Sequence, residues 1–132
     1  MSHFKDALRA RLLADAAVAA LVGRRIRWGV VPPKDVLPYV RLQVISDPRP
    51  EDLEDYTDAR VTRIQCDCFA TTDDAVTAVA DAIIAAVDAP ATVGGIAFGR
   101  TKAEGPRDLG EDSEEGFIHR ASLDLLAEHS RA

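Results

Sequence analysis

Residues 60–87, RVTRIQCDCFATTDDAVTAVADAIIAAV, decide the fold of this chain. The first part, from Arg60 to Phe69, alternates between two kinds of side chain, as a strand with one buried face does. One face would carry Thr62, Ile64, Cys66 and Cys68, and the other Arg63, Gln65 and Asp67. The alternation therefore predicts a half-buried strand.

A helix is predicted directly after this strand. Thr71 or Thr72 can cap its first turn, and apolar residues recur at steps of three and four from Val76 to Val87. Pro90 ends the helix because proline lacks the N–H that a further turn needs. An amphipathic helix that follows a half-buried strand predicts a sheet covered by helices on one face.

Further elements are predicted on both sides of this stretch. Tyr39–Ser46 repeats the alternation of the first strand. A helix from His3 to Val22 has one apolar stripe and ends at Gly23. Shorter patterns predict strands at Ile26–Val31, Ile96–Ala103 and Phe117–Leu126. The expected order is helix, three strands, helix, two strands.

These elements predict an α+β fold of two layers, one mainly antiparallel sheet of about five strands with two helices packed on one face. The 132 residues predict a single domain over 1–132. No apolar run approaches the roughly 20 residues that cross a bilayer, so we expect no membrane partner. The N-terminus lacks the apolar core of an export signal, so we expect the chain in the cytosol.

The charge balance, 16 basic against 22 acidic residues, argues against general nucleic-acid binding. The acidic residues are concentrated in 47–58 and 104–115, which are predicted to be long loops. Such loops are a solvated surface, a contact for a partner, or a means of repelling DNA; neither has the pattern of a calcium loop. The residues assigned to partner contact or DNA repulsion are Glu51, Asp52, Glu54, Asp55, Glu111, Asp112, Glu114 and Glu115.

No motif in the sequence predicts an enzyme or a bound cofactor. The chain has no nucleophile elbow, phosphate loop, dinucleotide fingerprint or zinc-protease helix. Cys66 and Cys68, with His119, are the residues from which a metal or small-molecule site could be built, and this is the alternative function. The simpler interpretation is that both cysteines are small core residues.

The polar face of the predicted sheet is either an ordinary solvated face or an interface between subunits, or the wall of a channel. Trp28 and Tyr39 are amphipathic aromatics near strand ends that could anchor an interface or fill the core. The residues assigned to a subunit interface are Trp28, Tyr39, Arg41, Gln43, Arg63, Gln65, Asp67 and Arg120.

Three stretches taken together resemble a known family. They are LLADAAVAALVG (12–23) followed by Arg25-Ile26, LPYVRLQVISD (37–47) and VTRIQCDCFA (61–70). Their order and spacing resemble the small tail-completion and tail-terminator proteins of long-tailed bacteriophages. The resemblance runs over nearly the whole chain and is strongest from Leu12 to Val87.

The resemblance implies a structural protein without catalytic residues. Such a protein caps the tail tube and joins it to the head connector, or stopper, as a ring usually of six copies. DNA passes through the ring without specific binding. The expected partners are then further copies of the chain, the tail tube protein and the connector. The expected location is the virion tail at the head–tail junction, assembled in the cytoplasm of a bacterial host. The source would be a phage, a prophage or a gene transfer particle. A rival interpretation is a regulatory adaptor that pairs through its sheet edge.

Overall fold

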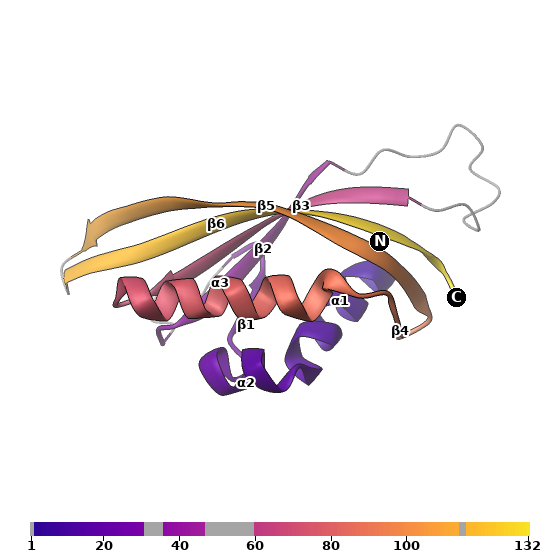
Figure 1. Cartoon of the computed structure of the whole chain (residues 1–132), viewed down its shortest axis with the longest axis horizontal. Helices are drawn as coiled ribbons and strands as arrows, with labels where there is room; N and C mark the ends of the chain where they lie inside the picture. The colour runs from indigo at the N-terminus through magenta and orange to yellow at the C-terminus, as the bar shows by residue number, and fades with distance from the viewer. Residues whose placement is uncertain (1, 31–35, 47–59, 114–115) are drawn as a thin grey trace.

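The computed structural model describes residues 2–30, 36–46, 60–113 and 116–132, in which three helices cover a six-stranded sheet (Figure 1). The helices are α1 (Ser2–Ala14), α2 (Ala16–Val22) and α3 (Asp73–Asp88). The strands are β1 (Ile26–Trp28), β2 (Tyr39–Ser46), β3 (Arg60–Ala70), β4 (Ala91–Val93), β5 (Ile96–Ser113) and β6 (Gly116–Arg131). Their order across the sheet is β1-β2-β3-β6-β5-β4, and only the β1–β2 pair is parallel. The α+β class is supported, with one more strand and one more helix than expected.

The segment that decides the fold forms the predicted elements. β3 runs one residue beyond the predicted strand, and α3 follows after two residues. Thr72 caps α3, because its hydroxyl accepts a hydrogen bond of 3.1 Å from the backbone N–H of Ala75. The buried face of α3 carries Val76, Val79, Ala80, Ile83 and Val87.

The predicted N-terminal helix is two helices. Asp15 has an extended backbone between α1 and α2, and its side chain accepts a hydrogen bond of 3.0 Å from the N–H of Val18. A short carboxylate side chain favours this capping position over a helix interior. The chain therefore turns at Asp15, and α1 and α2 pack separately.

All three helices lie on the same side of the sheet (Figure 1). The register places Cys66 of β3 between Leu42 of β2 and Leu123 of β6, and all three side chains are fully buried. Phe4 and Leu8 of α1 are buried in the same core. The predicted placement of the helices on one sheet face is confirmed.

The acidic stretch that was predicted to be a loop at 104–115 is, from Glu104 to Ser113, part of strand β5. β6 pairs with it as far as Ser113 opposite Gly116. Gly, Pro, Asp and Glu are uncommon in strands, which is why the sequence pattern hid this pairing. Residues 47–59 and 114–115 lie outside the described residues, so the other acidic stretch is not placed.

None of the helices in the described part of the chain is long and apolar enough to cross a membrane.

Candidate interaction surface

The sheet face turned away from the helices, called here the outer face, carries most of the polar side chains that the sequence singled out. The strand register places Arg41 opposite Asp67, Asp67 opposite Ser122, and Ser122 opposite Arg107. Four strands, β2, β3, β6 and β5, therefore contribute to one row across this face.

Asp67 is the centre of the first cluster on the outer face. Its Oδ2 accepts hydrogen bonds from Arg41 Nη2 at 2.9 Å and from Arg120 Nη2 at 3.0 Å. Gln65 Nε2 donates to both carboxylate oxygens, at 3.2 and 3.0 Å. Side chains from three strands thus hold the carboxylate; we call Asp67, Arg41, Arg120 and Gln65 the Asp67 cluster.

Asp67 has no exposed side-chain surface, whereas the two arginines keep 29% and 27% of theirs. Burial on its own raises the pKa of a carboxyl group. Here the hydrogen bonds from Arg41, Ser122 and Gln65 and the charge of Arg120 outweigh burial, so the pKa of Asp67 lies below its ordinary value. The group is a fixed anion beneath two cations.

An aromatic platform supports the two arginines. The guanidinium carbons of Arg41 and Arg120 lie 5.7 and 5.6 Å from the ring centroid of Phe69. Tyr39 stacks on the same ring at 4.7 Å. These contacts fix the direction of the guanidinium groups, because a cation is attracted to the face of an aromatic ring.

A second cluster is built around Asp124 of β6. Arg63 Nη1 lies 2.9 Å from Asp124 Oδ2, and Arg107 Nη2 lies 3.6 Å from Asp124 Oδ1. Arg107 also donates to Ser122 Oγ at 3.2 Å, and Arg63 lies 3.7 Å from Glu104. The outer face is thus a continuous arrangement of alternating charges.

The structure brings together most of the predicted interface residues but not all. Arg41, Gln65, Asp67 and Arg120 form the Asp67 cluster, with Tyr39 beside it, Gln43 opposite Gln65, and Arg63 in the second cluster. Trp28 is not on this face: its Nε1 donates to the backbone oxygen of Lys5 in α1 at 3.0 Å.

Sequence reasoning missed two contributors, Phe69 and Arg107. Phe69 lies on the outer face at the end of the alternation, and it is 6% exposed. Arg107 was hidden in the acidic stretch taken for a loop. The face is also less solvated than expected, since Asp67 and Ser122 are completely buried. The arginine side chains cover the shorter polar ones.

Of the acidic residues assigned to partner contact, Glu111 and Asp112 lie on β5 and are exposed. Glu51, Asp52, Glu54, Asp55, Glu114 and Glu115 lie outside the described residues.

The alternative metal or small-molecule site gains no support. Cys66 and Cys68 are free thiols, fully buried in the core between the sheet and the helices. The side-chain hydrogen bond with Cys68, followed by burial, raises the pKa of Cys66 well above its ordinary value, which disfavours the thiolate that binds metals. In the parts of the chain that are described, no three His, Cys, Asp or Glu side chains gather as a metal site requires.

The outer face presents residue types that are common in binding surfaces. The Nε atoms of Arg41 and Arg120 are buried and have no hydrogen-bond partner among the described residues. Tyrosine and arginine are enriched in the centres of protein interfaces, where they combine apolar area with directed hydrogen bonds.

Two comparisons with known proteins match almost the whole chain. A family model described as "Tail completion protein gp17" matches residues 6–129. Among solved structures, the chain is similar to a chain of "Virion of native gene transfer agent (GTA) particle", with 25% identity, a TM-score of 0.64, and coverage of 96% of this chain and 93% of that chain. No curated protein matches the sequence significantly. The two matches confirm the family that the sequence resembled and support a location in the virion tail.

Proposed function

Because this chain belongs to the tail completion protein gp17 family, we propose that it is a non-enzymatic structural component that closes the end of the tail tube. The observation that carries this proposal is the family match over residues 6–129. The similarity to a chain of a gene transfer agent virion supports a role inside an assembled particle.

In this role the chain forms a ring, usually of six copies, between the tail tube protein and the head connector. The outer face provides the contact between subunits. Arg41 and Arg120 keep 29% and 27% of their side-chain surface exposed there, and the half-buried Tyr39 supplies aromatic area of the kind that interfaces favour. The residues proposed for the ring contact are Tyr39, Arg41, Gln43, Arg63, Gln65, Asp67 and Arg120.

DNA passes the ring without specific binding. Specific and non-specific DNA binding both require clustered lysine and arginine that replace counterions on the phosphates. The described acidic stretch of β5 has the opposite charge, with Asp108, Glu111 and Asp112 exposed. Facing the DNA path, these carboxylates repel the phosphate backbone and keep the passage free.

Removal of the chain from its particle tests the proposal. Electron microscopy of particles assembled without it is expected to show heads and tails that fail to join, or tubes of uncontrolled length. Supplying the wild-type chain restores joined particles. Normal joined particles without the chain would overturn the proposal.

A variant on the outer face tests the ring contact separately. Gln43→Arg adds bulk and one positive charge on a half-buried position of β2, outside the Asp67 cluster. Complementation is expected to fail although the variant folds. Ala85→Arg makes the same change in charge on the exposed side of α3 and is the matched control. Equal complementation by both variants contradicts a subunit contact on the outer face.

A further inference from the structure

The two edges of the sheet, at β1 and at β4, differ in how their backbone groups are paired. At the β1 side, Arg9 of α1 donates to the backbone oxygens of Ile26 at 2.8 Å and Arg24 at 3.2 Å. These bonds satisfy two backbone acceptors beside β1. At the other side, β4 pairs with β5 only over 96–98. From residue 99 to 113, no described strand pairs with β5 on the side away from β6, so a long edge stays open to another strand.

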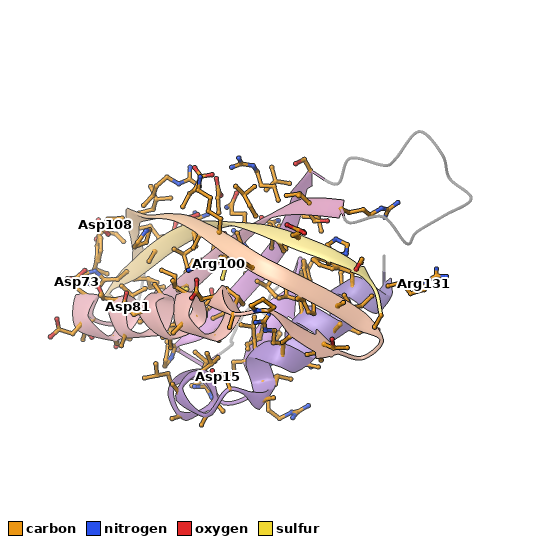
Figure 2. The ribbon with its side chains drawn as sticks, turned by 45° about the vertical axis from the view of Figure 1, so that its right-hand side comes forward. Asp15, Asp73, Asp81, Arg100, Asp108 and Arg131 are labelled. Carbon is orange, nitrogen blue, oxygen red and sulfur yellow. The ribbon has the colours of Figure 1, made fainter. Side chains whose placement is uncertain are left out.

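A hollow of about 470 Å³ lies beside this open edge, between α3 and β5. Its lining residues are Ile84, Asp88, Arg100, Thr101, Lys102 and Ala103; Figure 2 labels Arg100 where β5 runs over α3. Thr101 is only 5% exposed, yet its Oγ1 has no hydrogen-bond partner among the described residues. A buried hydroxyl without a partner is unfavourable.

The open edge carries opposite charges at its two ends. Lys102 lies toward the start of β5, and Asp108, Glu111 and Asp112 lie toward its end. All four side chains are exposed, and none forms an ion pair with a described residue. Such a strand is complementary in charge to a second copy of itself that runs in the opposite direction.

We propose that two copies of the free chain associate through antiparallel pairing of their β5 edges. The register that fits places Lys102 opposite Glu111 of the second copy, and Thr101 opposite Asp112 of the second copy. The two-fold axis repeats both pairs.

The side-chain directions agree with this register. Thr101 pairs with Ala127 of β6, and Asp112 pairs with Phe117. Since alternate β6 residues share a face, Ala127 and Phe117 both point to the helix side, and so do Thr101 and Asp112. By the same reasoning Lys102 and Glu111 share the outer side. Each proposed pair therefore joins side chains on one face of the extended sheet.

The irregular part of β5 lies at the axis, where it interferes least. The pairing of β5 with β6 shifts register between Glu104 and Arg107. Pro106, which has no N–H to donate, falls inside this interval. The regular stretches 101–104 and 109–112 lie on either side of it and form two short ladders. A two-fold contact of this kind is closed and stops at a dimer.

The mass of the purified full-length chain, measured by light scattering over a range of concentrations, tests the proposal. The expected result is a dimer. Lys102→Glu and Glu111→Lys each place like charges opposite each other twice, and each is expected to weaken association roughly tenfold. The double variant restores opposite charges and is expected to return to within roughly threefold of the wild-type affinity.

Matched controls carry the same charge changes away from the edge. Arg24→Glu and Asp81→Lys alter exposed residues of the β1 side and of α3 and are expected to leave the dimer unchanged. Circular dichroism of every variant verifies that it folds. A second measurement, amide hydrogen exchange, is expected to show concentration-dependent protection at 101–104 and 109–112.

These measurements on the purified chain are independent of the test of the tail function, which is made by electron microscopy of assembled particles. A monomer at all concentrations overturns the dimer, and so does a larger ring that the changes at Lys102 and Glu111 leave intact. A dimer that the double variant does not restore overturns the β5 pairing.

Discussion

At Asp67, side chains from three strands meet on one carboxylate. Charge-assisted hydrogen bonds are stronger than neutral ones, and a buried carboxylate needs them. The two arginines also need the carboxylate, because their side chains are mostly buried and Asp67 balances part of their charge. Asp67 therefore holds together the first cluster on the outer face.

Replacing Asp67 with Asn keeps the size of the side chain and removes its charge. We expect Asp67→Asn to lower the free energy of unfolding at pH 7 by about 2 kcal/mol. Urea unfolding measures this loss. Asp124→Asn is the matched control; it is expected to cost less, because the side chain of Asp124 is 25% exposed. Equal losses contradict a special role for Asp67.

The effect of Asp67 on stability depends on pH with a definite sign. Folding lowers the pKa of this group, so its contribution is complete above its ordinary value of 3.8 and disappears as the pH falls through the lower folded value. The difference in unfolding free energy between wild type and Asp67→Asn is expected to stay constant from about pH 8 to 5 and to shrink below about pH 4. A difference that grows on acidification contradicts this assignment.

Two buried threonines are expected to respond oppositely to replacement by valine. Thr101 Oγ1 has no partner among the described residues, so Thr101→Val is expected to stabilise the monomer by about 1 kcal/mol. Thr62 Oγ1 lies 2.8 Å from Nε2 of the buried His129, so Thr62→Val is expected to destabilise by about 1 kcal/mol. Thermal unfolding at a concentration below dimerisation measures both, and a loss of stability in Thr101→Val would contradict the unsatisfied hydroxyl.

Among the elements, the break between α1 and α2 depends on one side chain. Asp15→Ala removes the hydrogen bond to the N–H of Val18 and is expected to cost about 1 kcal/mol. Asp15→Asn keeps an accepting oxygen and is the control, with an expected loss of a few tenths of a kcal/mol. The measurement is chemical unfolding, and losses of the same size in both variants would show that the cap is unimportant.

Local periodicity predicted the elements whose two faces differ most. β2 has the predicted bounds, and α3 begins and buries residues as predicted, because alternation and three-to-four spacing are properties of adjacent residues. β4 was missed because three residues after Pro90 are too few to show alternation. The second half of β5, from Glu104 to Ser113, was missed because Gly105 and Pro106 interrupt the alternation of side chains.

The sequence predicted which sheet face carries the residues of the candidate site, but not which of these residues contact one another. Alternation along β3 placed Asp67 on the polar face, but its partner Arg120 lies 53 residues further along the chain. Which residues meet depends on the β3–β6 register, and the packing of the whole sheet determines that register. His129 is a similar case: the last strand was predicted to end at Leu126, yet β6 continues to Arg131 and His129 is buried in it.

For the whole molecule, the helices and the sheet share one buried core. The single domain predicted from length is therefore expected to unfold in one step. Far-ultraviolet circular dichroism follows all elements, and the fluorescence of Trp28, the sole tryptophan, follows the contact between β1 and α1. The two transitions are expected to coincide in denaturant. Separate midpoints would indicate that the β1 side unfolds independently.

The burial of Cys66 and Cys68 gives the molecule a built-in reporter of opening. The hydrogen bond between the two thiols, together with burial, keeps the pKa of Cys66 high, and both sulfur atoms are shielded from reagents in the native protein. A fluorescent maleimide would therefore react with a cysteine engineered on the surface and spare the native pair. The same reagent would label Cys66 and Cys68 only when the sheet separates from its helices, so labelling rates would report that separation directly.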